Sequence, residues 1–256
     1  MALLAGLSPL NRFLIFCVFG FVGFVGIGFF VAVTGMLFGI VPTSSTLTPV
    51  PDSGMPEIDI ILDISGSMAG EIDGEVKLEI AKEILKSFIY NVTGSNIGLR
   101  LLGVTDCDTK QLITIGKNDP DAFVNAITPL QPSGLTPIEL SLTEAKNDFK
   151  LNGKKAIILI SDGQETCNGD PCKVAKEMAN EGISVIHTVG FDLAEDGVQD
   201  LKCVAAATGG KYFDAKNKQQ LLDAVNQSYV EITSSYCEEL SNPISKYLCH
   251  FGGGRN

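Results

Sequence analysis

The amino-acid sequence predicts an α/β fold in which helices cover both faces of a doubly wound, mostly parallel six-stranded sheet, preceded by one transmembrane helix. Short apolar runs suited to buried strands alternate along most of the chain with segments whose apolar residues recur at helical spacing. Ahead of this alternation, residues 13–41 contain no charged residue. A membrane-spanning helix needs only about 20 residues, so this segment is long enough to cross a bilayer.

We interpret residues 13–41 as an uncleaved signal anchor. The apolar region of a cleaved signal peptide, which is the alternative, is usually only about 7–15 residues long. Arg12 is the only charged residue before Asp52, so the positive-inside rule places residues 1–12 in the cytoplasm and the rest of the chain outside. The expected location is therefore the cell membrane, crossed once, with the carboxy-terminal part in the periplasm or outside the cell.

Two features flank this expected span. Gly35 and Gly39 form a GxxxG pattern, which permits close helix–helix approach and makes self-association through this helix one interpretation. Residues 42–56 are rich in Pro, Ser and Thr, as is typical of an extended stalk.

The expected α/β domain occupies residues 57–234. Its first strand is Ile58–Asp63, and a helix over 75–90 follows, with apolar residues at every fourth position from Val76 to Phe88. A short turn at Asp106–Thr109 joins the next two strands. The other elements expected in this half are strands at 97–104 and 111–115 and helices at 120–127 and 137–149.

The second half of the domain continues the alternation. Lys155–Ile160 (KAIILI) has the continuous apolar character of a strand buried on both faces. The elements expected after it are helices at 171–180, 198–207 and 217–234 and strands at 184–189 and 211–214. Residues 235–256 show little hydrophobic pattern and form a separate tail.

The charge balance excludes one class of partner. The chain has a net charge of −11, and everything after the span carries 18 basic and 30 acidic residues, so 18 − 30 gives −12. Nucleic-acid binding needs a basic surface, so we expect none. Two explanations for the acidity stay open, namely solubility and a surface that carries bound cations.

The cysteine pattern indicates disulfides. Cys17 lies in the expected span, and an even number of cysteines remains in the translocated part, where disulfides form readily. These candidate disulfide cysteines are Cys107, Cys167, Cys172, Cys203, Cys237 and Cys249. Their connectivity stays open, although Cys237 and Cys249 together would close a small loop in the tail.

Five residues with oxygen-bearing side chains form the candidate metal site: Asp63, Ser65, Ser67, Thr136 and Asp162. Each follows a strand-like run or lies in a loop expected beside one. Ligands of open α/β sheets bind outside the carboxyl ends of strands, so these side chains are expected in one crevice. Hydroxyls and carboxylates suit Mg²⁺, with Mn²⁺ or Ca²⁺ as alternatives, whereas zinc prefers His and Cys.

Three separated motifs carry a resemblance to a known family: Asp63-Ile64-Ser65-Gly66-Ser67, Thr136-Pro137 and Ser161-Asp162-Gly163. In this order they resemble the metal-ion-dependent adhesion site (MIDAS) of von Willebrand factor type A (VWA) domains. The resemblance covers about residues 57–234. Segments 166–172 and 207–213 are similar to those of bacterial, membrane-anchored members.

The resemblance implies a division of roles in the site. Ser65, Ser67 and Thr136 would bind the cation directly, whereas Asp63 and Asp162 would act mostly through bound waters. The open coordination position would take an Asp or Glu carboxylate from a partner protein. The implied function is a non-enzymatic, cation-dependent adhesion or assembly module held at a membrane.

Alternatives to this interpretation remain at the level of sequence. Each motif taken alone could be an ordinary turn or helix cap. A scaffold subunit with a structural metal site is a second function. A Mg²⁺-dependent phosphatase with Asp63 as nucleophile is a third, but it needs an acid/base group where Ser65 stands. Asp106 and Asp108 are either a second cation or partner contact or a solvated turn.

Overall fold

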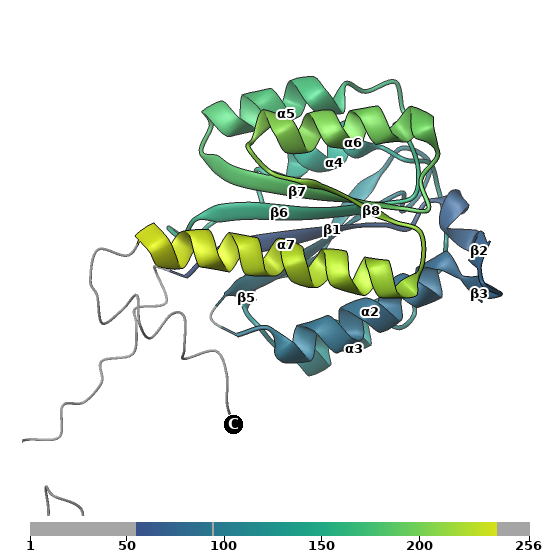
Figure 1. Cartoon of the computed structure of the whole chain (residues 1–256), viewed down its shortest axis with the longest axis horizontal. Coiled ribbons are helices and arrows are strands. Elements are labelled where there is room, and N and C mark those ends of the chain that lie inside the picture. Colours follow the sequence, from purple (N-terminus) through teal and green to yellow (C-terminus); the bar gives the residue numbers. More distant parts are fainter. Residues whose placement is uncertain (1–54, 94, 240–256) are drawn as a thin grey trace, which may run out of the picture. The chain divides into compact units, whose positions relative to one another are not determined.

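The computed structural model describes residues 55–93 and 95–239 (Figure 1). Their centre is a six-stranded sheet with the order β5-β4-β1-β6-β7-β8. All neighbouring strands run parallel except β4 and β5, which confirms the predicted mostly parallel sheet. The strands are β1 Glu57–Asp63, β4 Asn96–Leu102, β5 Thr109–Lys117, β6 Lys155–Ser161, β7 Ile183–Phe191 and β8 Tyr212–Ala215.

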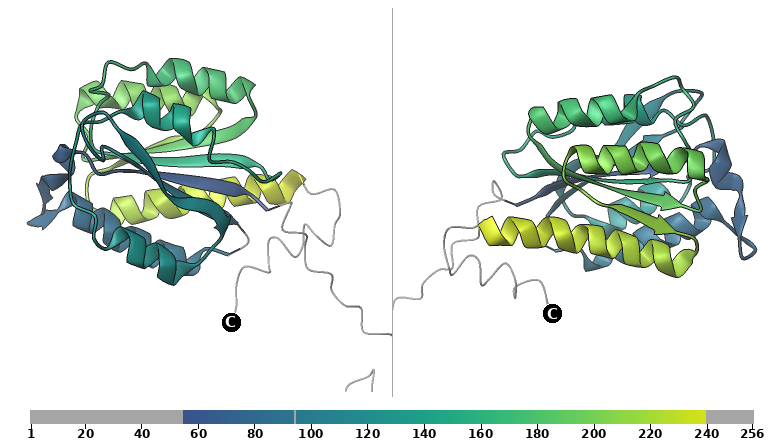
Figure 2. Two further views of the ribbon diagram at one scale, coloured as in Figure 1. Left: turned by 180° about the vertical axis from the view of Figure 1, so that it is seen from behind. Right: turned by 45° about the horizontal axis from the view of Figure 1, so that its top comes forward.

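Helices cover both faces of this sheet (Figures 1 and 2). One face carries α2 Lys77–Asn91, α3 Pro120–Ile127 and α7 Lys218–Glu239. The opposite face carries α4 Ile138–Ala145, α5 Pro171–Asn180 and α6 Glu195–Ala207. The doubly wound arrangement expected from the sequence is therefore confirmed.

Strand β1 shows why these residues form a central strand. Every residue of β1 is buried, as its continuous apolar run predicts. Ile58, Ile60 and Leu62 belong to the core beneath α2 and α7, whereas Ile61 belongs to the core beneath α4 and α5. Burying each such side chain contributes about 1.5–3 kcal/mol, which anchors β1 and therefore Asp63 at its carboxyl end.

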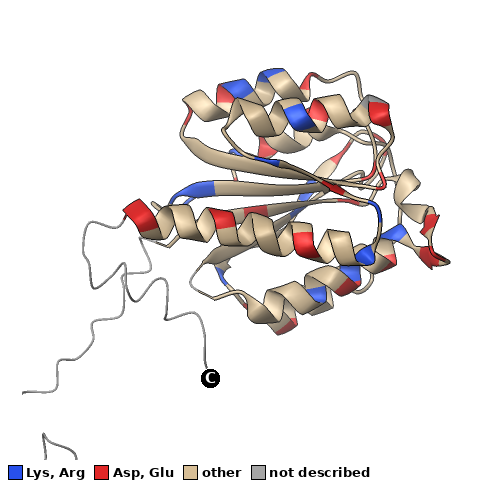
Figure 3. Ribbon diagram, viewed as in Figure 1, with Lys and Arg blue, Asp and Glu red and all other residues tan. Residues whose placement is uncertain are grey.

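A small hairpin corrects the start of the first predicted helix. Strands β2 Glu71–Ile72 and β3 Glu75–Val76 pair antiparallel. The turn Asp73–Gly74 joins them, with positive φ angles of 53° and 83°, as a two-residue hairpin turn requires. The helix predicted from Glu75 therefore begins at Lys77. Figure 3 shows that the hairpin is acidic.

Other boundaries differ by a few residues. Helix α4 ends at Ala145 rather than 149, α6 begins at Glu195 rather than 198, and α7 continues to Glu239, past the predicted end of that helix at Ser234. In α7 the extension contains the buried Cys237. The burial of Cys237 packs this extension against the domain.

Two disulfides form among the predicted cysteines: Cys107–Cys167 and Cys172–Cys203. The first joins the β4–β5 turn to the β6–α5 loop, and the second joins α5 to α6. The predicted pairing of Cys237 with Cys249 involves a residue outside the described part of the chain.

The predicted anchor at 13–41, the GxxxG pattern and all but the last two residues of the predicted stalk (42–56) also lie outside the described residues. Within residues 55–93 and 95–239, no helix is both long and apolar enough to cross a membrane.

Candidate metal site

The first loop of the site folds back on the end of β1. The buried carboxylate of Asp63 accepts hydrogen bonds from the Ser65 amide at 2.7 Å and from the Ser161 hydroxyl at 2.5 Å. Ser161 is the last residue of the neighbouring strand β6. One oxygen of Asp63 is therefore held by the loop that follows β1 and the other by the end of β6.

A chain of hydrogen bonds continues from this loop to the second aspartate. The hydroxyl oxygens of Ser65 and Ser67 lie 3.0 Å apart. The Ser67 hydroxyl in turn donates to Asp162 Oδ1 at 2.6 Å. Residues separated by 95 positions in sequence are thus in direct contact.

Thr136 reaches the same place from the loop before α4. A Cβ atom added to Gly163 would lie 3.1 Å from the Thr136 hydroxyl oxygen and 3.5 Å from that of Ser67. Both hydroxyls therefore face the space that Gly163 leaves open. The structure brings all five predicted site residues together at one end of the sheet.

The position of the site follows from the sheet topology. The chain proceeds from β1 to β4 on one side and later crosses to β6 on the other side. Asp63 ends β1, and Asp162 follows the last residue of β6. The strand order thus reverses between β1 and β6, and the crevice outside such a reversal is where open α/β sheets bind ligands.

Electrostatics at this point favour an added cation. Burial, followed by the negative charge of Asp162, raises the pKa of Asp63 to about 6, although hydrogen bonds from Ser161 and Ser65 act in the opposite direction. Two carboxylates that repel one another in a buried site are stabilised by a positive ion between or beside them.

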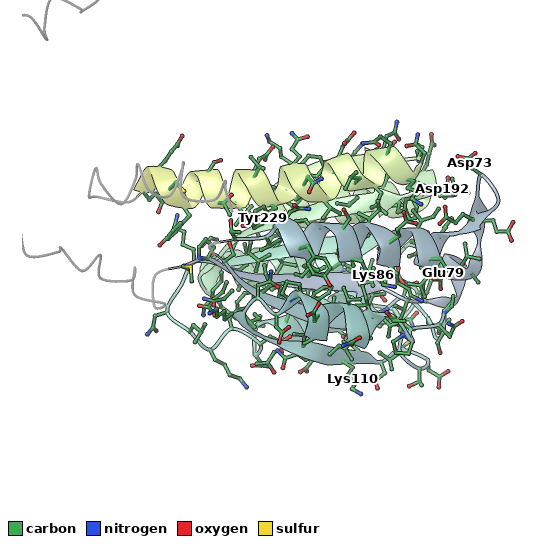
Figure 4. All side chains as sticks on the ribbon, turned by 90° about the horizontal axis from the view of Figure 1, so that it is seen from below. Asp73, Glu79, Lys86, Lys110, Asp192 and Tyr229 are labelled. Carbon is green, nitrogen blue, oxygen red and sulfur yellow. A yellow bond between two sulfur atoms is a disulfide. The ribbon has the colours of Figure 1, made fainter. Side chains whose placement is uncertain are left out.

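Lys77 is a part of the site that the sequence did not reveal. Its ammonium group lies 3.1 Å from Asp162 Oδ2 and 3.0 Å from Asp192 Oδ2. Burial alone lowers the pKa of Lys77, but the hydrogen bond that Lys77 donates to Asp192 and the charge of Asp162 outweigh it, so the pKa is raised. Figure 4 labels Asp192 at the same end of the domain as Asp73 of the hairpin. No local pattern around Lys77 signals this role.

The residues present fit a hard divalent cation. Within the described residues, no group of three or more His, Cys, Asp or Glu side chains is arranged to hold a metal. The site has two carboxylates and relies on three hydroxyls for the remaining oxygen atoms, and this donor set is one that Mg²⁺ accepts.

Asp106 and Asp108, the candidates for a second cation, have roles in the β4–β5 turn. Asp106 adopts a positive φ of 41°, and its carbonyl accepts the Leu135 amide at 2.7 Å. The Asp108 carboxylate accepts the Thr109 amide at 2.8 Å. These contacts match the turn interpretation, while a second cation there stays a prediction.

Comparison with known proteins gives the family. The sequence model of the von Willebrand factor type A domain matches residues 58–164. A functionally uncharacterized protein of Bacillus subtilis, YwmC, is 30% identical over 208 residues, which cover 75% of this chain and 91% of that protein.

Several solved structures share the fold. BatB, a conserved hypothetical protein of Bacteroides thetaiotaomicron, superposes with a TM-score of 0.58 at 20% identity, covering 70% of this chain and 98% of that one. The pilus adhesin SpaC of Lactobacillus rhamnosus superposes with a TM-score of 0.57 at 18% identity, covering 70% of this chain and 31% of that one.

A third structure with this fold is proximal thread matrix protein 1 of the mussel byssus, described with zinc in its MIDAS motif. It gives a TM-score of 0.56 at 16% identity, covering 77% of this chain and 46% of that one. The family model matches residues 58–164, and YwmC is similar to this chain over 91% of the length of YwmC. We conclude that the chain belongs to the von Willebrand factor type A domain family.

Proposed function

We propose that this domain is a cation-dependent protein-binding module in which a Mg²⁺ ion, held by the five site residues, binds a carboxylate of a partner protein. The observation that carries the proposal is the convergence of oxygen-bearing side chains from three separate segments beside the space left by Gly163. Mn²⁺ and Ca²⁺ are alternative occupants with the same preference for oxygen.

The donor set explains why such an ion would bind a partner. The hydroxyls of Ser65, Ser67 and Thr136 would be direct ligands, and they are neutral. Asp63 and Asp162 would act mostly through waters. The ion therefore keeps much of its positive charge, and Mg²⁺ readily retains exchangeable coordination positions. A carboxylate from outside would take one of them.

The net charge of the chain makes this attraction conditional on metal. A protein of net charge −11 repels an acidic partner at long range. A divalent cation in the crevice reverses the sign of the potential at that one place. Binding would therefore require metal, and its removal would release the partner.

The surface around Thr136 supports a protein partner. Leu135, the residue before Thr136, is 47% exposed, and Leu140 in α4 is 37% exposed. Apolar side chains beside a charged anchor point are typical of protein interfaces, where a few desolvated contacts supply most of the affinity. We therefore place the partner over the crevice and the start of α4.

The setting that fits this module is the outer face of a membrane. The support is the charge-free segment 13–41, which we propose as the anchor. A scaffold subunit of a membrane or surface assembly, including one that self-associates through the GxxxG pattern, is the second candidate. It is favoured by the same anchor and would keep its partners without metal.

Catalysis is not part of the proposal. A phosphatase with Asp63 as nucleophile would need an acid/base group two residues later, where the chain has Ser65. The Ser65 hydroxyl contacts the Ser67 hydroxyl instead. The adhesin fold relatives and the family match are consistent with an interaction module.

The proposal is tested by calorimetric titration of the full chain with Mg²⁺, Mn²⁺ and Ca²⁺. We expect one ion to bind per chain and the Asp63→Asn variant to lose that binding, while Ser87→Ala, which removes an exposed hydroxyl on α2, retains it. Absence of binding at about millimolar metal, the range of weak extracellular cation sites, with the protein folded, contradicts the proposal.

A second experiment separates the two candidate functions. Interacting proteins are captured with the full chain in Mg²⁺ and then exposed to a chelator. Release by chelator, and failure of Asp63→Asn to capture the same proteins, supports the adhesion module. Retention under both conditions favours the scaffold.

A further inference from the structure

Thr136 is the site residue whose position depends most on loop structure. Asp63 ends a strand and Asp162 directly follows one, so both are fixed by the sheet. Thr136 lies in the irregular segment between α3 and α4, which we call the Thr136 loop (residues 133–137). Loops tolerate movement that strands do not, so other contacts must hold its hydroxyl toward Ser67 and Gly163.

The β4–β5 turn (residues 103–108) supports one side of the Thr136 loop. The Leu135 amide donates to the Asp106 carbonyl at 2.7 Å. The two backbones approach so closely that a Cβ on Gly134 would lie 2.7 Å from the Gly103 carbonyl oxygen. Gly134 also has a positive φ of 62°, so a glycine is required there on both grounds.

The β6–α5 loop (residues 162–170) supports the other side. The Thr136 amide donates to the Thr166 hydroxyl at 2.8 Å, and the Thr166 amide donates back to the Thr136 carbonyl at 3.1 Å. Because these two hydrogen bonds are reciprocal, they fix both the amide and the carbonyl of Thr136.

The disulfide Cys107–Cys167 joins these two supports. Cys107 directly follows Asp106, and Cys167 directly follows Thr166, so each half of the bond adjoins a residue that holds the Thr136 loop. The Cα atoms lie 5.7 Å apart across a sequence separation of 60 residues. Without the bond, only non-covalent contacts keep the two supports against opposite sides of the loop.

We propose that the Cys107–Cys167 disulfide is a clamp that positions Thr136 for metal binding, and that the affinity of the site for a divalent cation depends on it. This inference rests on the proposed metal-binding function. Groups that orient a metal ligand without touching the metal typically change affinity 10–100-fold, and preorganisation of this kind acts by lowering the ordering cost of binding. The two cysteines are thus positioning residues.

The second disulfide provides a matched control. Cys172–Cys203 joins α5 to α6 on one face of the sheet, with a sequence separation of 31 residues. The Cys107→Ser/Cys167→Ser and Cys172→Ser/Cys203→Ser double variants each lose one disulfide by the same chemistry. We expect the first to bind Mg²⁺ about tenfold more weakly and the second to bind within about twofold of the wild type.

Two further measurements separate positioning from general damage. Hydrogen exchange on the metal-free chain should show faster exchange of the Leu135 and Thr136 amides in the clamp variant than in the control variant. Thr166→Val, which keeps the disulfide but removes the hydroxyl that accepts the Thr136 amide, should also weaken Mg²⁺ binding. If the Cys107→Ser/Cys167→Ser variant does not fold, Thr166→Val still tests whether the position of Thr136 controls Mg²⁺ affinity.

The results separate failure of the metal site from failure of the disulfide clamp. If the wild-type chain binds none of Mg²⁺, Mn²⁺ and Ca²⁺, the proposed function is wrong, whereas the exchange of the Leu135 and Thr136 amides still tests the clamp. If the wild type binds and the two double variants have equal affinity and equal amide exchange, the clamp is wrong while the metal site stands. Equal Mg²⁺ affinity of Thr166→Val and the wild type also contradicts the clamp.

Discussion

Strand β1 carries two buried aspartates, Asp59 and Asp63, whose surroundings differ in one respect. Asp59, in the middle of the strand, has a permanent cation nearby in Arg100. Asp63, at its end, faces hydroxyls and the second carboxylate, Asp162. The fold supplies Arg100 to the interior acidic cluster of Asp59 and Asp148, and we propose that a divalent cation completes the cluster of Asp63 and Asp162 at the strand ends.

The interior cluster, which consists of Asp59, Arg100 and Asp148, contains its own cation. Arg100 donates two parallel hydrogen bonds, both 2.8 Å long, to the carboxylate of Asp148. Burial, and then the charge of Asp148, hold the pKa of Asp59 well above its usual value, against the opposing charge of Arg100. The raised pKa of Asp59 favours its protonated form, and the charges of Arg100 and Asp148 offset one another.

The open cluster at the strand ends, Asp63 and Asp162 with the neighbouring hydroxyls, has less positive charge beside it. Its only described cationic contact is Lys77, which Asp162 shares with Asp192 outside the site. Two acidic groups therefore remain incompletely neutralised beside three hydroxyls. This imbalance is what a divalent cation would correct.

Removal of the interior cation should have the largest effect. Arg100→Met leaves Asp148 buried without its partner, and breaking a buried pair in this way typically costs about 3–5 kcal/mol. Urea unfolding measures the loss. As a control, Lys154→Met removes the exposed pair with Glu239 and should cost less than about 1 kcal/mol. Equal losses in the two variants would show that the interior cluster does not need Arg100.

The two disulfides should stabilise the fold almost equally. Chain-entropy arguments give about 4 kcal/mol for each of the closed loops, with a difference of only about 0.6 kcal/mol between them. We expect similar falls in the free energy of unfolding for both double-serine variants. Their Mg²⁺ affinities should nevertheless differ, because only Cys107–Cys167 lies at the open cluster. A fall in the free energy of unfolding in only one of the two variants would contradict the expected equal contributions of the disulfides.

Asp59 should make stability depend on pH. Its pKa in the folded chain is raised, so its contribution to stability is fully present below the unfolded pKa of about 4 and is lost as pH rises through the folded pKa. Asp59→Asn cannot ionise, so this substitution should flatten the fall in stability above about pH 4. Urea unfolding curves recorded across this pH range measure the effect, and an unchanged slope contradicts the assignment.

The smallest effect is expected at Lys77. Its ammonium group competes with a cation for Asp162, so Lys77→Met should tighten Mg²⁺ binding by about threefold to tenfold, or roughly 1 kcal/mol. Lys86→Met makes the same change farther along α2, about 13 Å away by helix geometry, and should leave affinity unchanged. Calorimetry distinguishes them, and weaker binding in Lys77→Met would mean that Lys77 supports the site instead.

The sequence predicted the open cluster better than the interior one, for a physical reason. Asp63, Ser65 and Ser67 lie within one turn, and the apolar runs before Asp63 and Asp162 identify both as strand ends. Parallel pairing then brings the ends together. The hairpin at Asp73–Gly74 was not predicted, although an Asp-Gly pair favours the positive φ angles of such a turn.

The contacts that the sequence did not predict depend on register and packing. Lys77 meets Asp162 across 85 positions, and Arg100 meets Asp148 across 48. Neither pair follows from spacing along a helix or strand. The pairing of Cys107 with Cys167 was likewise open, because predicting it requires knowing that the turn after β4 and the loop after β6 both contact the Thr136 loop.

We propose that three separate segments, which contribute Ser65, Thr136 and Asp162, together hold one cation. The most direct test of this proposal is a Mn²⁺ titration followed by electron paramagnetic resonance of the free ion, on the wild-type chain and on one variant from each segment: Ser65→Ala, Thr136→Ala and Asp162→Ala. We expect one bound Mn²⁺ per wild-type chain and strongly weakened binding in all three folded variants. Wild-type affinity in any one of them would contradict the proposal.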